Sequence, residues 1–197
     1  MIDSCYRNLN IDVSNALKNT WRDSCTTFHK SGNYGEWQPL ADRVFNKEWL
    51  EYMKSIGLPI FNCMIFYRGP YSHTNGAHID VSRAKPFTVR HFGINWCVGG
   101  HGSEMVWYKL PDDAEKRVEV TAANSTYVSW PFNSLKEVER HHIGNKVTLV
   151  KTGVPHAIIM KAEPRWCFSA RTSIPDNFTW EKAIELFRSK NLLIENI

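Results

Sequence analysis

Residues 146–173 read KVTLVKTGVPHAIIMKAEPRWCFSARTS and hold three short apolar runs in close succession. Their β-branched and aromatic residues predict strands over residues 146–151, 157–161 and 166–173. Gly144-Asn145 precedes the first run and Glu163-Pro164 precedes the last, and both dipeptides are typical of turns. This stretch therefore indicates a β-rich fold in which the chain reverses direction often.

The same pattern extends back to Ile60. Further strand-like runs cover residues 60–67, 87–98, 105–110, 118–120 and 126–130. About eight short strands separated by turn residues predict a jelly roll or a related barrel-like double sheet.

Helical patterns flank this region. Apolar residues recur at helical spacing over residues 39–56, and Gly57 is a good helix end. Thr179 is a plausible N-cap for a second helix that runs through Ser189. The predicted fold is mainly β, a cupin-like jelly roll with flanking N-terminal and C-terminal helices.

The 197 residues suit one sizeable core and are few for two. We expect a single domain over residues 1–197, with helical or irregular support from residues 1–59. Residues 60–175 would form the jelly-roll core, and residues 176–197 the C-terminal helix. No apolar run is long enough for a bilayer, and no signal peptide is evident at the start. Five scattered cysteines without a C-x-x-C pair fit a reducing compartment, so we expect a cytoplasmic protein.

The net charge of +4 is mild. The basic stretch 136–151 also contains two glutamates, and we interpret it as an exposed turn between strands. The sequence therefore does not favour nucleic acid as a partner.

Three residues could bind one metal ion. His78 and Asp80 are two positions apart, so on a strand both side chains project from the same face. His156 lies far along the chain, before an apolar run. Two imidazoles and one carboxylate are the facial ligand set of non-haem iron oxygenases. Each residue also has an ordinary interpretation, because Asp80 could cap a turn and His156 could be a hydrogen-bonded core histidine.

Arg171 and Ser173 share a face of the predicted strand 166–173. We expect this strand to pair as a hairpin with residues 157–161, which would bring Arg171 beside His156. A buried guanidinium requires an anion and binds a carboxylate best. A salt bridge to Asp176 or Glu163 is the alternative partner. Arg165 is the competing arginine, and its place in the turn predicts exposure to solvent.

With these residues in place, the chain resembles the 2-oxoglutarate- and Fe(II)-dependent dioxygenases. The family pattern is H-x-D, a distant His and then an arginine, on a double-stranded β-helix, and it is matched over about residues 60–175. The resemblance implies that His78, Asp80 and His156 bind Fe(II) and are catalytic. It implies that Arg171, with Ser173, binds the far carboxylate of 2-oxoglutarate, and it makes Tyr67 and Asn95 candidate cosubstrate contacts.

The implied reaction is hydroxylation of an organic substrate by O₂, with release of succinate and CO₂. A small molecule and a peptidyl side chain are both compatible with the sequence as substrates. Three other functions stay open: a cupin-like metal-binding protein or isomerase, an oxidative nucleic-acid demethylase, and a structural jelly roll. The oligomeric state is open too.

Overall fold

The computed structural model describes residues 4–23, 29–31, 34–72, 76–81, 88–120, 126–175 and 178–194. Its helices are α1 (Ala41–Val44), α2 (Lys47–Ser55) and α3 (Trp180–Ser189), with a short 3₁₀ turn at Phe132–Ser134. Its strands are β1 (Tyr6–Asn8), β2 (His29–Ser31), β3 (Tyr34–Trp37), β4 (Ile60–Arg68), β5 (Ala77–Asp80), β6 (Phe92–Gly99), β7 (Glu104–Lys109), β8 (Arg117–Val120), β9 (Thr126–Trp130), β10 (Lys136–His142), β11 (Thr148–Lys151), β12 (His156–Ile159) and β13 (Arg165–Thr172).

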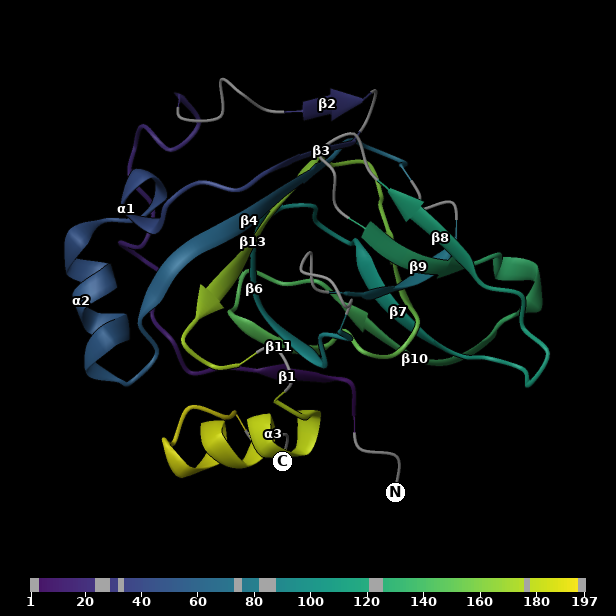
Figure 1. The fold of residues 1–197 in the computed structure, drawn as a ribbon. Coiled ribbons are helices and arrows are strands. Elements are labelled where there is room, and N and C mark those ends of the chain that lie inside the picture. The colour runs from purple at the N-terminus through teal and green to yellow at the C-terminus, as the bar shows by residue number, and fades with distance from the viewer. Residues whose placement is uncertain are drawn as a thin grey trace.

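These strands form two antiparallel sheets. One has the order β1-β11-β6-β13-β4-β3-β2 and the other the order β10-β7-β12-β5-β9-β8. From β4 to β7, and again from β10 to β13, the chain crosses from one sheet to the other at every strand. This alternation produces a jelly roll, and it confirms the predicted fold class (Figure 1).

The space between the sheets is identified by side chains that cross it. Tyr6 of β1 packs edge-on against Trp107 of β7, with ring centroids 6.3 Å apart. Directly paired residues of adjacent antiparallel strands share a face, so the strand register extends this inward face across both sheets. On the seven-stranded sheet it includes Asn62, Met64, Phe66 and Arg68 of β4, Gly93, Asn95 and Cys97 of β6, and Arg165, Cys167, Ser169 and Arg171 of β13. On the six-stranded sheet it includes Trp107, His156, His78, Asp80, Tyr127 and Ser129.

The opposite face of the seven-stranded sheet packs against the helices. Phe168 of β13 and Trp96 of β6 lie 5.3 Å apart in this layer and join a core with Trp49 of α2 and Phe187 of α3. Figure 1 shows α1, α2 and α3 outside the sheets. The main apolar core therefore lies outside the barrel, and this leaves the interior free to carry polar groups.

Several predicted elements differ from the structure. The helix expected over residues 39–56 is two helices, α1 and α2, separated by Phe45 and Asn46, and Gly57 follows α2 at φ +75°. The prediction for α3 is confirmed, because the Thr179 side chain accepts a hydrogen bond from the Lys182 amide. Residues 1–59 also contribute β1, β2 and β3, which short length concealed in the sequence.

Two further predictions were wrong. Part of the basic stretch expected to be a turn forms strand β10, whose backbone pairs with β7. The expected hairpin does not form either, because β12 pairs with β5 and β7 while β13 pairs with β4 and β6. A turn after β12 carries the chain into the other sheet, so His156 faces Trp107 and His78 rather than Ala170.

Candidate metal centre

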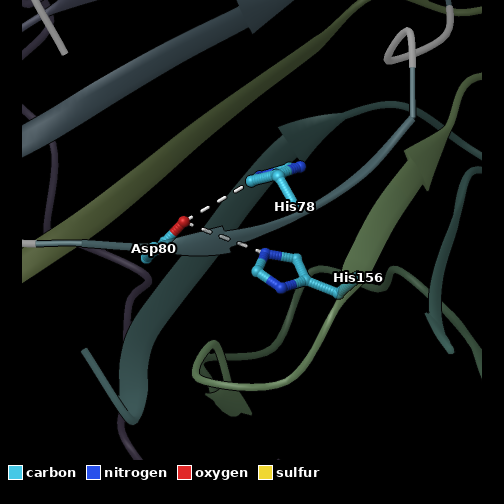
Figure 2. A group of neighbouring side chains, drawn as sticks. All are labelled: His78, Asp80 and His156. Carbon is cyan, nitrogen blue, oxygen red and sulfur yellow. Dashed lines mark ion pairs between the residues drawn. The ribbon is translucent and has the colours of Figure 1, made fainter. Parts of the chain in front are cut away.

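Two neighbouring strands of the six-stranded sheet bring His78, Asp80 and His156 together. His78 and Asp80 alternate along β5, and His156, the first residue of β12, pairs directly with His78. The two imidazole Nε2 atoms lie 3.8 Å and 3.9 Å from the same Asp80 oxygen, and Figure 2 shows both facing this carboxylate. One ligand atom from each residue falls within 4.8 Å of the others. The predicted convergence of these three side chains is therefore present.

Hydrogen bonds fix the orientation of this group. His156 Nδ1 lies 2.9 Å from the carbonyl of Val154. If Nδ1 carries the proton, it donates to that carbonyl and leaves the Nε2 lone pair facing Asp80, as is usual for a metal-bound histidine. The backbone of Asp80 is held on both sides, since its amide donates to Thr152 and its carbonyl accepts from the Arg90 amide.

Electrostatics keep His78 in the form that binds metals. Burial, followed by the nearby His156 and Arg68, lowers the pKa of His78 well below its usual range. A neutral imidazole is the ligand form, so His78 is ready to bind a cation near neutral pH.

The spacing and chemistry of the donors fit a divalent transition metal. Two ligands each about 2.1 Å from an ion are at most about 4.2 Å apart, and each imidazole Nε2 lies within this limit of the Asp80 oxygen, at 3.8 and 3.9 Å. The side chains of His156, His78 and Asp80 are 5%, 17% and 38% exposed. The carboxylate therefore lies on the side open to solvent, and two nitrogens with one oxygen leave room for further ligands.

Two arginines lie opposite, on the inward face of the seven-stranded sheet. Arg165 of β13 pairs directly with Arg68 of β4, and we call these two residues the inner arginine pair. The expectation that Arg165 faces solvent was wrong, because it is the first residue of β13 and only 5% exposed. The turn residues end one position before it, at Pro164.

The inner arginine pair carries more positive charge than its described neighbours balance. Arg165 Nε donates to Cys97 Sγ at 3.1 Å, and the Arg68 guanidinium lies over the Tyr34 ring, 5.0 Å from its centre. Among the residues that the structure describes, neither guanidinium forms an ion pair with a carboxylate. Guanidinium groups that are buried, as in Arg165, or partly buried, as in Arg68, favour a site for an anion.

The other predicted cosubstrate residues lie in different places. Arg171 is on the inward face of β13, six residues beyond Arg165, and lines a pocket with Arg90. Ser173 follows the end of β13 and is exposed. The Tyr67 prediction was wrong, because its ring packs against Trp166 at 4.8 Å on the opposite face of the sheet. Asn95 does face inward, and its buried Oδ1 has no hydrogen-bond partner within the part of the chain that the structure describes.

Of the two alternative partners predicted for Arg171, only Glu163 lies among the described residues, so the salt bridge to Asp176 stays a prediction. Asp176 lies outside the described residues. Glu163 is exposed in the turn before β13 and accepts a hydrogen bond from the His101 amide.

Sequence reasoning missed three polar side chains near this centre. Besides Arg68, these are Tyr127, whose ring centre is 5.7 Å from that of His78, and Tyr34, which donates to Glu36 at 2.5 Å. Burial and then the hydrogen bond to Glu119 raise the pKa of Tyr127 to about 12. Alternation along the predicted strand 126–130 was the available signal for Tyr127, but the choice of face depended on the partner strand.

Comparison with known proteins adds little to this geometry. No protein-family model matches the chain, and no curated protein matches it. Similar solved structures include vicilin from Corylus avellana (hazelnut), at 12% identity and a TM-score of 0.34, over 72% of this chain and 30% of vicilin. Another is the E. coli protein ycfD, at 12% identity and a TM-score of 0.40, over 80% of this chain and 38% of ycfD.

This chain thus spans well under two-thirds of either protein, and similarity at this level carries no argument about activity. The structure itself gives a cupin-like jelly roll with a His-Asp-His group able to hold a metal ion. No helix among the described residues has both the length and the apolar character needed to cross a bilayer.

Proposed function

We propose that this protein is a non-haem Fe(II)- and 2-oxoglutarate-dependent oxygenase that hydroxylates an organic substrate. The observation that carries the proposal is the placement of His78, Asp80 and His156 opposite the inner arginine pair, within one jelly roll. A facial ligand set and a buried cationic site are the two parts that a chelating dicarboxylate requires.

Each part has a distinct role. The two imidazoles and the Asp80 carboxylate would hold Fe(II), which with 2-oxoglutarate supplies the oxidising chemistry when bound. Val154 keeps Nε2 of His156 directed at the metal position through the Nδ1 hydrogen bond. The overall reaction places one oxygen atom of O₂ in the new hydroxyl group and the other in succinate, with loss of CO₂.

The inner arginine pair is the better candidate for the far carboxylate of 2-oxoglutarate. Arg68 acts electrostatically on His78, so the pair and the metal ligands share one interior. Arg165 is more deeply buried than Arg171, and a guanidinium removed from water gains most from a carboxylate. This assignment replaces Arg171 in that role and gives it to Arg165, assisted by Arg68.

The test is anaerobic addition of 2-oxoglutarate to the Fe(II)-loaded protein, monitored by the visible charge-transfer band of the chelate. We expect the band in the wild type and its loss in Asp80→Ala, because the ion loses its only carboxylate ligand. Arg165→Met should weaken 2-oxoglutarate binding by at least about tenfold, the effect of roughly 1.4 kcal/mol from one charge-assisted contact.

Arg188→Met, on the exposed side of α3, is the matched control and should bind like the wild type. Succinate formation in the presence of O₂ gives an independent measurement. A wild type that binds Fe(II) but shows neither band nor succinate would be a metal-binding jelly roll without this activity, and the proposal would be wrong.

A further inference from the structure

A second polar pocket lies at the other end of β13 from Arg165. It has a volume of about 240 Å³, and its polar lining comes from Gln38, Asn62, Arg90, Arg171 and Thr172. Six residues of strand, at about 3.3 Å each, separate Arg171 from Arg165 by roughly 20 Å. The pocket is therefore distinct from the inner arginine pair.

The pocket adjoins the metal centre through backbone contacts. The Arg90 amide donates to the carbonyl of Asp80 at 3.0 Å, so Arg90 is one hydrogen bond from a metal ligand. Gly93 also lines the pocket, and a Cβ built at Gly93 would stand 3.3 Å from Asn95 Oδ1. The Asn95 side chain thus lies beside the pocket on the inward face of β6. The pocket is thus connected to Asp80 through the backbone of Arg90.

The pocket offers two kinds of polar group. Arg90 and Arg171 in its lining supply positive charge suited to a carboxylate. Asn62 Oδ1, in the lining, and Asn95 Oδ1, outside it but next to Gly93, are both buried hydrogen-bond acceptors without a partner among the described residues. Leaving a buried acceptor unsatisfied costs about 1–3 kcal/mol, so each favours a ligand that brings a hydrogen-bond donor. Asn62 pairs directly with Arg171, which places an acceptor and a cation side by side.

We propose that this pocket binds the carboxylate and ammonium groups of a free α-amino acid, the primary substrate. The carboxylate lies against Arg90 and Arg171, and the ammonium group donates to the amide oxygens. A volume of 240 Å³ equals about eight water molecules at ~30 Å³ each, which fits a small metabolite rather than a folded partner. The role as oxygenase substrate rests on the proposed function, whereas binding itself does not.

The test is equilibrium dialysis against an equimolar mixture of the twenty protein L-α-amino acids, with retained compounds identified by mass spectrometry. It is run anaerobically with Fe(II) and 2-oxoglutarate. We expect the wild type to retain one amino acid or a few related ones. Arg171→Met should weaken binding of the retained amino acid by at least about tenfold, since a charge-assisted contact is lost. The Arg188→Met protein should match the wild type.

A second variant separates loss of the ligand contact from loss of folding. Asn62→Leu removes one acceptor and leaves both arginines in place. We expect it to weaken binding of the amino acid but not binding of the matching 2-oxo acid analogue, which lacks the ammonium group. Circular dichroism establishes that each variant is folded. The proposal would be overturned if the wild type retained no amino acid, or if Arg171→Met and Asn62→Leu retained it as well as the wild type does.

The chelate band distinguishes this inference from the proposed function. Arg171→Met should keep the band, because the pocket does not hold 2-oxoglutarate. Loss of the band in Arg171→Met, with retention in Arg165→Met, would assign Arg171 to the cosubstrate and defeat the pocket proposal. If the wild type retains an amino acid, Arg171→Met does not, and the wild type shows no chelate band, the pocket proposal is supported and the oxygenase proposal is contradicted.

Discussion

At the scale of single residues, the interior is defined by side chains that would be costly if buried alone. Cys97 and Cys167 pair directly across β6 and β13, beside Arg165. The hydrogen bond from Cys167 and the charge of Arg165 lower the pKa of Cys97 to about 6. Arg165 therefore favours the thiolate form of Cys97, while Arg165 and Arg68 together carry two positive charges at this place.

This pKa gives a pH-dependent prediction. Cys97 should release its proton near pH 6 when folded, against about 9 in the unfolded chain. The unfolded state then binds more protons between these values, so the free energy of unfolding contributed by Cys97 rises with pH from about 6 to 9. Thiolate absorbance in the ultraviolet and urea unfolding across this range measure both effects.

Cys97→Ser should remove the absorbance change near pH 6, whereas Cys63→Ser, which alters a buried cysteine on the outer face, should preserve it. An unchanged titration in Cys97→Ser would assign the thiolate elsewhere.

At the scale of elements, the turn between β6 and β7 determines where Arg165 lies. Gly99, Gly100 and Gly102 all have positive φ, which only glycine adopts readily. A Cβ at Gly100 would stand 2.7 Å from the Arg165 Cβ, whereas at Gly102 the nearest atom is 3.7 Å away. Gly100 and Gly102 therefore both need a positive φ, but only a side chain at position 100 would meet Arg165.

Alanine substitutions at these two positions separate backbone strain from contact with Arg165. Both Gly100→Ala and Gly102→Ala should lower the free energy of unfolding by about 1–2 kcal/mol through the left-handed conformation. Gly100→Ala should cost more, because Arg165 must shift, and it alone should weaken 2-oxoglutarate binding. Urea unfolding and chelate titration measure the two effects, and equal behaviour of the variants would show that Arg165 adapts freely.

At the scale of the whole molecule, the proposed site joins the two sheets. The metal ligands come from β5 and β12 of one sheet, and the inner arginine pair comes from β4 and β13 of the other. A metal ion and a dicarboxylate bound together would bridge the sheets and stabilise only the folded chain.

We therefore expect a large thermal shift. With ligand at 100 times its Kd, the stabilisation is about 2.7 kcal/mol, or roughly 5–10 °C for a chain of this size. Calorimetry with Mn(II) as a redox-inert substitute and 2-oxoglutarate measures the shift. Asp80→Ala should abolish the shift. If the Tm of the wild type does not change when Mn(II) and 2-oxoglutarate are added, the bridging site is contradicted.

The sequence by itself determined the local patterns. The strand-like runs predicted eight of the strands and the jelly roll, because alternating apolar residues and turn dipeptides are local signals. It also predicted His78 and Asp80 on one face, because their spacing on a strand fixes the side on which both project. Short strands such as β1–β3 and the polar β10 carried too little apolar pattern to be seen.

Only the tertiary structure decided which strands became neighbours. The turn at Glu163-Pro164 was visible in the sequence, but whether it closes a hairpin or crosses between sheets depends on the packing of both sheets. That choice moved Arg165 inward, set Arg68 beside it and turned Tyr67 away. The sequence determines which side chains of a strand share a face. Packing between distant parts of the chain decides which of the two faces is the interior, and this packing put Arg165 and Arg68 opposite the metal ligands.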